Sequence, residues 1–382
     1  MIFRQRIIYS FLLILLSLPT CAQKVKSVIP YREVGGKMIV DMLINGVTRA
    51  LIFDTGGRTS LTGELCDELG LQVRDSLVVT DVNSNRAAYP VVQIDQLGFT
   101  DQKIVFSHVL AMKLNKPSPF ECFGADGLIG SELLGQGQFI VEIDGRAKTI
   151  TLMTAENPSS ASLRKMVSFA QGGVMPILNL HTGVGNKLLV LFDTGYGGFL
   201  SLKKTDYDVL LPAGACTVLA EGFGGASIGV GGLSRESMIH RVEFPTLTVS
   251  GTRFTHVSSE TGTPPFSLLG MKLLDYGKVT IDYVRCRFYF EPYEETNDLK
   301  SKHYDVNLRV KDGELVVASV WGAMRDIVKV GDRITQINGK PAGVYDFCES
   351  IITGIPELKR KKKVKLTVQT EKGEKVIVYG KK

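Results

Sequence analysis

The chain has 382 residues, of which 44% are hydrophobic and 22% are charged, and its formal net charge at pH 7 is +6. These proportions exclude wholesale disorder, and the length predicts two or three domains. From Leu299 onward, 18 Lys and Arg stand against 10 Asp and Glu, which gives +8 for this part and −2 for the rest. The 40 glycines and 14 prolines indicate many turns, as in a protein built mainly of β-strands.

Residues 1–22 have the pattern of a secretory signal peptide. Two arginines precede an apolar run at 7–18, and small residues end the segment. The run is shorter than the roughly 20 residues that span a bilayer, so we expect export to the periplasm or cell envelope. Two alternatives stay open: cleavage after Ala22, which gives a soluble protein, or a lipid anchor on Cys21, because residues 18–20 loosely resemble a lipobox.

The remaining cysteines are scattered and show no CxxC spacing, which argues against a zinc site and against a dense disulfide framework. A single bridge is left open, although a chain of this length does not need one. These cysteines are Cys66, Cys122, Cys216, Cys286 and Cys348.

A basic run at 359–363 lies between two strand-like stretches and has no aromatic residues interleaved with it. Such a run can bind nucleic acid or anionic lipid, but this setting favours a solvated hairpin loop. We therefore expect no nucleic-acid partner.

The chain repeats itself, and the repeat is the strongest feature of the sequence. Four segments recur in the same order: LIFDTG at 51–56 and VLFDTG at 190–195, FSHV at 106–109 and FTHV at 254–257, GLIGSELL at 127–134 and SLLGMKLL at 267–274, and IVEID at 140–144 and VTIDY at 279–283.

The spacing within the two copies is nearly the same. Asp54 and Gly130 are 76 residues apart, and Asp193 and Gly270 are 77 apart. Two similar lobes follow, at 23–154 and 167–293, joined by a linker at 155–166; they are called lobe 1 and lobe 2 below.

Within each lobe the pattern is mostly strand. The segments 37–44 and 49–53, separated by Asn45-Gly46, predict a β-hairpin, and 177–180 with 188–192 predict its repeat. Short helices are expected at 63–69 and around 131–134.

Each Asp-Thr-Gly triplet ends an apolar strand. Such a strand carries the carboxylate into a partly buried place, and glycine permits the tight turn behind it. A single Asp-Thr-Gly is a weak signal, but two, each followed at nearly equal distance by two apolar residues and a glycine, are specific.

On these residues the chain, from 29 to 292, resembles a retropepsin-like aspartic protease with both halves on one polypeptide, as in pepsin. The resemblance implies a mainly β, two-lobed acid-protease fold. It also implies that Asp54 and Asp193 meet as a catalytic dyad, with segments 128–130 and 268–270 beside the two turns.

The resemblance further implies the chemistry. Two adjacent carboxylates cannot both ionise easily, so they hold one proton between them and activate a water molecule against a peptide bond. Thr55, Gly56, Thr194 and Gly195 would support the dyad. No metal or organic cofactor is implied, and the partner would be a peptide or protein substrate.

Proteins of this family close flaps over the substrate. The candidate tips are 81–86 in lobe 1 and the glycine-rich segment 222–232 in lobe 2. The latter lacks the strand-turn-helix context of a phosphate-binding loop, so a flexible loop is expected. His108 and His256 occupy equivalent repeat positions and are expected to be structural.

Two residues depart from the family pattern, which prefers Ala or Ser after Asp-Thr-Gly. Gly57 follows the first triplet, and the bulky Tyr196 follows the second and could narrow the cleft. The alternative is therefore a noncatalytic peptide-binding envelope protein that keeps the turns as scaffold.

From about Leu299 the pattern changes, and the run VGDRITQING at 330–339 resembles bacterial PDZ domains. The resemblance implies an α+β domain at 299–382 that binds extended peptides at a sheet edge. The binding loop would be Tyr304, Asp305 and Val306, leading into 307–310.

The family usually has glycine where Asp305 stands, which puts capture of a terminal carboxylate in doubt. Because 287–290 would close the sheet of lobe 2 and 294–300 reads as a polar linker, we expect the lobes to fold without this domain.

Overall fold

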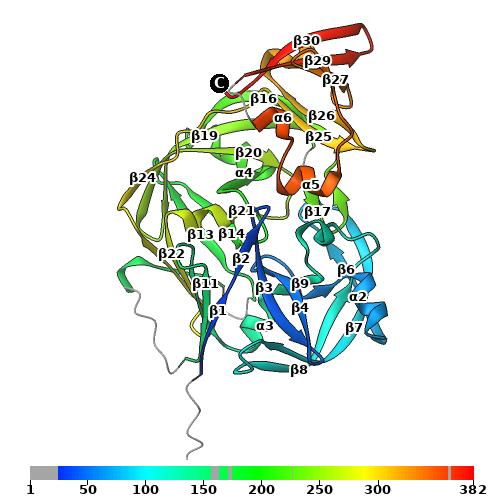
Figure 1. The fold of residues 1–382 in the computed structure, drawn as a ribbon. Coiled ribbons are helices and arrows are strands. Elements are labelled where there is room, and N and C mark those ends of the chain that lie inside the picture. Colours follow the sequence, from blue (N-terminus) through cyan, green and yellow to red (C-terminus); the bar gives the residue numbers. More distant parts are fainter. Residues whose placement is uncertain (1–24, 156–162, 171–173, 226, 360–362) are drawn as a thin grey trace, which may run out of the picture.

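The computed structural model describes residues 25–155, 163–170, 174–225, 227–359 and 363–382. The protein is mainly β, as the sequence predicts (Figure 1). The predicted signal peptide with Cys21, most of the predicted linker and part of the basic run lie outside the described residues. Within the described part of the chain, none of the helices combines the length and the apolar composition that a membrane span requires.

Lobe 1 contains one eight-stranded sheet. In sheet order its strands are β2 (Arg32–Val34), β3 (Lys37–Ile44), β4 (Val47–Asp54), β9 (Gly127–Gly130), β5 (Ser60–Leu61), β8 (Val105–Lys113), β7 (Arg86–Phe99) and β6 (Val73–Thr80). The predicted helices are present as α2 (Gly63–Glu68) and α3 (Ser131–Gln136), and a 3-10 helix, η1, covers Pro119–Phe123. The predicted β3–β4 hairpin turns at Asn45 and Gly46, which both have positive φ, as this two-residue turn requires.

A 14-stranded sheet combines lobe 2 with the C-terminal region. Its main path runs β24 (Thr296–Asp298), β20 (Thr252–Gly262), β15 (Leu200–Lys203), β21 (Ser267–Gly270), β14 (Lys187–Asp193), β13 (Ile177–Thr182), β19 (Ser237–Val249), β16 (Thr217–Gly224), β26 (Glu314–Trp321), β27 (Arg333–Ile337), β29 (Val364–Thr370) and β30 (Gly373–Tyr379). Two strands lie off this path: β25 (Val306–Lys311) pairs with β26, and β28 (Lys340–Pro341) pairs with β27.

The smaller elements connect or cover these strands. They are β17 (Ile228–Gly229), β18 (Gly232–Leu233), α4 (Lys204–Leu210), η3 (Met271–Asp275), η4 (Gly322–Asp326), α5 (Phe347–Ile352) and α6 (Pro356–Lys359).

The sequence repeat is also a structural repeat. In lobe 1, β4 pairs in parallel with β9, so that Asp54 lies opposite Gly130. In lobe 2, β14 pairs in parallel with β21, and Asp193 lies opposite Gly270. Each two-apolar-glycine segment therefore runs beside its own Asp-Thr-Gly turn.

A six-stranded sheet joins the two lobes. Its order is β1 (Lys26–Pro30), β11 (Thr149–Met153), β10 (Ile140–Asp144), β22 (Gly277–Asp282), β23 (Arg287–Pro292) and β12 (Met166–Ser168), and the 3-10 helix η2 (Leu163–Lys165) precedes β12. The central pairing of β10 with β22 crosses from lobe 1 to lobe 2. One hydrophobic core contains buried side chains from both lobes, so the lobes are held together by this shared core as well as by the six-stranded sheet.

Two expectations about the C-terminal boundary are wrong. The strand at 287–290 belongs to the six-stranded sheet and does not close the 14-stranded sheet of lobe 2, which continues into the C-terminal region because β26 pairs with β16 and places Trp321 opposite Gly222. Within the expected polar linker, β24 forms a strand parallel to β20. The segment 315–321 is buried throughout and apolar except for Ser319, which is typical of a central strand with neighbours on both sides, as β26 is.

The C-terminal region nevertheless has a hydrophobic core of its own, built around Val317, Ile334 and Leu366. A disulfide between Cys122 of η1 and Cys348 of α5 ties it to lobe 1 as well. Spacing could not have paired these cysteines, because they are 226 residues apart in the chain. The other three cysteines described are free and buried: Cys66, Cys216 and Cys286.

Candidate active site

The first Asp-Thr-Gly turn fixes the Asp54 carboxylate at the end of β4. The strand ends in three buried apolar residues, Leu51, Ile52 and Phe53, which anchor the turn in the core of lobe 1. The backbone N–H of Gly56 donates to Asp54 Oδ1 at 2.9 Å. This hydrogen bond orients the carboxylate.

The second turn is built in the same way at the end of β14. The N–H of Gly195 donates to Asp193 Oδ1 at 2.7 Å. The N–H of Tyr196 donates to the Asp193 carbonyl at 3.1 Å and closes the turn. The two sequence copies thus produce two equivalent local geometries.

The two threonines join the turns to each other. Thr55 Oγ1 donates to the Phe192 carbonyl, and Thr194 Oγ1 donates to the Phe53 carbonyl, both at 2.7 Å. Each hydroxyl also accepts the backbone N–H of the opposite threonine, at 3.0 and 3.1 Å. Both threonines are fully buried, so these four hydrogen bonds form without competition from water.

The glycines show how closely the turns approach. A Cβ on Gly195 would lie 2.4 Å from Asp54 Oδ2, and one on Gly56 would lie 2.5 Å from Asp193 Cγ. Each carboxylate therefore rests on the glycine of the other turn, where no other residue fits. The structure brings all six predicted dyad and support residues together at one place.

The two carboxylates interact directly. Burial, then the charge of Asp54 and a side-chain hydrogen bond with it, raise the pKa of Asp193 well above the ordinary aspartate value. The Lys37 ammonium and the Gly195 N–H act in the opposite direction. Asp193 thus holds its proton at a pH where an exposed aspartate has lost it.

Gly57 and Tyr196, the two residues that depart from the family pattern, do not cover the Asp54 and Asp193 carboxylates. A Cβ on Gly57 would lie 2.7 Å from Asp54 Oδ2, so glycine leaves room for this carboxylate. The Tyr196 ring packs against Gly198 and Gly270 of its own lobe, and its hydroxyl donates to the Leu200 carbonyl at 3.3 Å.

The two predicted flap tips contact each other. Asn83 donates through its amide to the Gly232 carbonyl at 2.8 Å and to the Ser227 carbonyl at 3.3 Å. The Gly231 N–H donates to Asp81 Oδ2 at 2.9 Å. Sequence predicted the two segments but not their contact, which joins residues about 150 positions apart.

A cavity of about 260 Å³ lies in the C-terminal domain between β25 and the helices α5 and α6. Its apolar lining includes Leu308, Val310, Ile355 and Leu358. Of the three predicted loop residues, only Tyr304 lines the cavity. The Asp305 carboxylate contacts the Lys382 ammonium, and Val306 is buried in the core of the domain. The predicted strand at 307–310 contributes to the lining, whereas the helical residues were missed.

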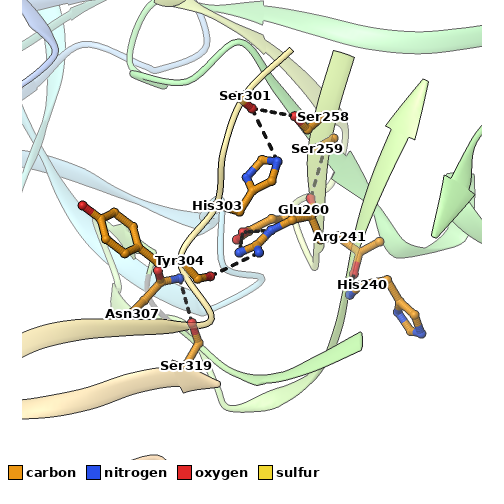
Figure 2. A network of polar contacts seen from close by, with 11 residues as sticks. His240, Arg241, Ser258, Ser259, Glu260, Ser301, His303, Tyr304, Asn307 and Ser319 are labelled. Carbon is orange, nitrogen blue, oxygen red and sulfur yellow. Dashed lines mark hydrogen bonds and ion pairs between the residues drawn. The ribbon is translucent and has the colours of Figure 1, made fainter. Parts of the chain in front are cut away.

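A buried arginine also escaped sequence reasoning. Arg241 is only 4% exposed, and its guanidinium donates to the Glu260 carboxylate at 2.7 Å and to the Tyr304 carbonyl at 3.2 Å. Figure 2 shows this guanidinium between Glu260 of lobe 2 and the segment that leads into β25. The cation also lies 4.1 Å from the centre of the Trp321 ring. Arg241 therefore fastens the C-terminal domain to lobe 2.

Comparison with known proteins adds little to this geometry. No family model matches the chain, and no curated protein matches it. The crystal structure of a retropepsin-like aspartic protease from Rickettsia conorii aligns with 35% of this chain and 92% of its own, at 16% identity and a TM-score of 0.26. A similarity this weak carries no argument about the site.

Proposed function

We propose that the protein is an aspartic-type peptidase, in which Asp54 and Asp193 form the catalytic dyad. One observation supports the proposal: the two Asp-Thr-Gly turns approach so closely that each aspartate carboxylate lies beside the glycine of the other turn. The buried threonine hydrogen bonds hold this arrangement rigidly, and a pre-organised site is what catalysis requires.

The raised pKa of Asp193 favours a pair that carries one proton. The ionised carboxylate accepts a proton from a water molecule, whose oxygen attacks the peptide carbonyl carbon. The protonated carboxyl donates to the carbonyl oxygen, and a proton then passes to the leaving nitrogen as the C–N bond breaks. The Gly56 and Gly195 N–H groups keep both carboxylates oriented throughout.

The test is hydrolysis of a denatured-protein substrate across a broad pH range by the wild type, Asp54→Asn and Asp193→Asn. Each substitution removes a group that must accept or donate a proton, so we expect loss of activity of about a thousandfold or more. Circular dichroism and thermal unfolding check that each variant is folded. Substantial activity in either folded variant contradicts a shared dyad.

An inactive, folded wild type would instead support a noncatalytic peptide-binding protein on the same fold. In that case the same denatured substrate should bind without being cleaved, and the Asp→Asn variants should bind it as well as the wild type does.

We also propose that the C-terminal domain is PDZ-like and binds an extended peptide in the groove between β25 and α5. The support is the apolar cavity beside β25, whose one partner among the described strands is β26, so that its other edge can accept a strand. Fluorescence anisotropy with a labelled peptide library should show binding that Leu308→Lys weakens. Loss of affinity on amidation of the peptide C-terminus would reveal carboxylate capture, despite the Asp305 contact with Lys382. Equal binding by wild type and Leu308→Lys would place the peptide elsewhere.

The signal-like N-terminus supports the further proposal that the protein is exported to the cell envelope, either soluble or anchored at Cys21. Radiolabelled palmitate incorporation that Cys21→Ala abolishes would identify the anchored form.

A further inference from the structure

Lys37 of lobe 1 reaches the second Asp-Thr-Gly turn. It is the first residue of β3 and follows a tight turn at Gly35 and Gly36, which both have positive φ. Val34 pairs with Lys37 across this turn. The short hairpin therefore leaves the Lys37 backbone little freedom.

The tip of this hairpin is wedged between three other parts of the molecule. A Cβ on Gly35 would lie 2.7 Å from Ile352 of α5 and 2.9 Å from Phe123 of η1. Gly36 lies against Gly197, just beyond the second turn, because a Cβ on Gly36 would be 3.7 Å from the Gly197 Cα. Lobe 1, lobe 2 and the C-terminal domain thus meet at this tip and fix its position.

From this position the Lys37 ammonium donates a hydrogen bond to the Gly195 carbonyl. The same residue, Gly195, donates its N–H to Asp193 Oδ1 at 2.7 Å. The ammonium also lies 5.6 Å from the centre of the Phe123 ring, whose face attracts the cation. Lys37 is therefore linked to the Asp193 carboxylate through a single residue, Gly195.

The two lobes differ at this position. The strand residue two positions before each dyad aspartate pairs with Ile39 in lobe 1 and with Ile177 in lobe 2. Lys37 stands two residues before Ile39, whereas Met175 stands two residues before Ile177. The internal repeat thus carries a cation in one copy and an uncharged side chain in the other.

We propose that Lys37 is a positioning residue of the dyad, which holds the second Asp-Thr-Gly turn through the Gly195 carbonyl and places a positive charge beside the carboxylate pair. The proposal rests on the function proposed above. Its electrostatic part is consistent with the direction in which Lys37 moves the pKa of Asp193, which is downward, against burial and Asp54. The Tyr196 hydroxyl, which also interacts with Asp193, has its own pKa raised by burial and then by Glu260 and Asp193.

The test compares Lys37→Met, which keeps length without charge, with Lys37→Arg, which keeps the charge. We measure the pH dependence of kcat/KM on a quenched mixed-sequence peptide library. Removing a nearby cation disfavours the ionised carboxylates, so both limbs of the profile should move to higher pH by about 1 unit in Lys37→Met. In Lys37→Arg both limbs of the profile should stay at their wild-type pH values.

Two outcomes overturn the proposal. A lower kcat/KM with unmoved limbs in Lys37→Met would show that the side chain only supports the fold. A higher kcat/KM at the optimum with unmoved limbs would show that Lys37 instead blocks a carbonyl that the substrate needs.

A second measurement does not depend on peptide cleavage. The carboxyl carbons of Asp54 and Asp193 are followed by ¹³C NMR against pH and assigned with Asp54→Asn and Asp193→Asn. The highest titration midpoint of the pair should rise by about 1 unit in Lys37→Met and not in Lys37→Arg. Unchanged midpoints overturn the role of Lys37, whereas shifted midpoints in a protein without peptidase activity overturn only the proposed function.

Discussion

At the scale of single residues, the threonines of the two turns matter as much as the aspartates. Thr194→Val removes the hydroxyl that joins the Phe53 carbonyl to the Thr55 N–H and leaves both buried groups unpaired. We expect a loss of about 2–4 kcal/mol of unfolding free energy, measured by urea denaturation. Thr280→Val is the matched control, because Thr280 is equally buried and its hydroxyl has no hydrogen-bond partner among the described residues. Equal costs for the two variants would show that the threonine bridge does not stabilise the fold.

The raised pKa of Asp193 also predicts a pH dependence of stability. In the unfolded chain this carboxyl loses its proton near the ordinary aspartate pKa of 3.8, whereas in the folded protein it keeps the proton to higher pH. The folded state is therefore favoured fully below pH 3.8 and progressively less as the pH rises toward the raised pKa, by at most about 1.4 kcal/mol per pH unit.

Asp193→Asn removes this titration. The unfolding free energy of the wild type minus that of Asp193→Asn, measured by denaturant at several pH values, should fall with rising pH above 3.8. A difference that is constant with pH would mean that Asp193 titrates alike in the folded and unfolded chain.

Whether a site residue could be predicted from the sequence depends on where its contact partner lies in the chain. Asp54 and Asp193 could be found because each belongs to a repeated hexapeptide with a repeated spacing. Lys37 and Arg241 could not, because each acts on a part of the chain that no motif connects to it. A single lysine at the start of a strand predicts only a solvent-exposed side chain at the strand end.

At the scale of elements, local patterns predicted the hairpins well and the pairing between distant strands poorly. The β3–β4 and β13–β14 hairpins follow from short turns between apolar runs. The pairing of β16 with β26 depends on Gly222, which leaves space for Trp321: a Cβ there would lie 2.5 Å from the indole ring. Glycine at this position reads in the sequence as loop flexibility, although it allows a close strand contact.

The contact between the flap tips predicts how an Asn83 variant should behave. Asn83→Ala removes the amide that donates to the Gly232 and Ser227 carbonyls. Because these bonds hold the second tip against the first, amide hydrogen exchange over 228–233 should accelerate about tenfold. Asn85→Ala is the control, since it removes an amide that donates to Asp81 of its own hairpin, at 3.5 Å, and keeps the Cβ that faces Gly231. Equal exchange in the two variants would mean that Asn83 does not hold the tips together.

At the scale of the whole molecule, several attachments hold the C-terminal domain. The β16–β26 pairing extends the sheet of lobe 2 into it, and Arg241 binds the Tyr304 carbonyl beneath Trp321. The Cys122–Cys348 disulfide joins it to lobe 1. The hairpin tip that carries Lys37 contacts Ile352 of the same helix as Cys348. The groove of this domain and the dyad are therefore connected through α5, η1 and the start of β3.

Because of these attachments, we expect removal of the C-terminal domain to destabilise the two lobes. The sequence alone predicts that the two lobes fold without residues 299–382, but truncation would uncover the β16 edge and leave the buried Arg241 without the Trp321 ring. Loss of the β16–β26 hydrogen bonds and of the packing of Trp321 on Gly222 removes buried contacts, so we expect the truncated protein to be destabilised by several kcal/mol. The truncation is made with Cys122→Ser and compared with full-length Cys122→Ser, so that both proteins lack the disulfide. Thermal unfolding should give a clearly lower Tm for the truncated protein, and cleavage of a short peptide should fall with it. The same Tm and the same cleavage in both would restore the modular picture, in which the lobes need nothing from the C-terminal domain.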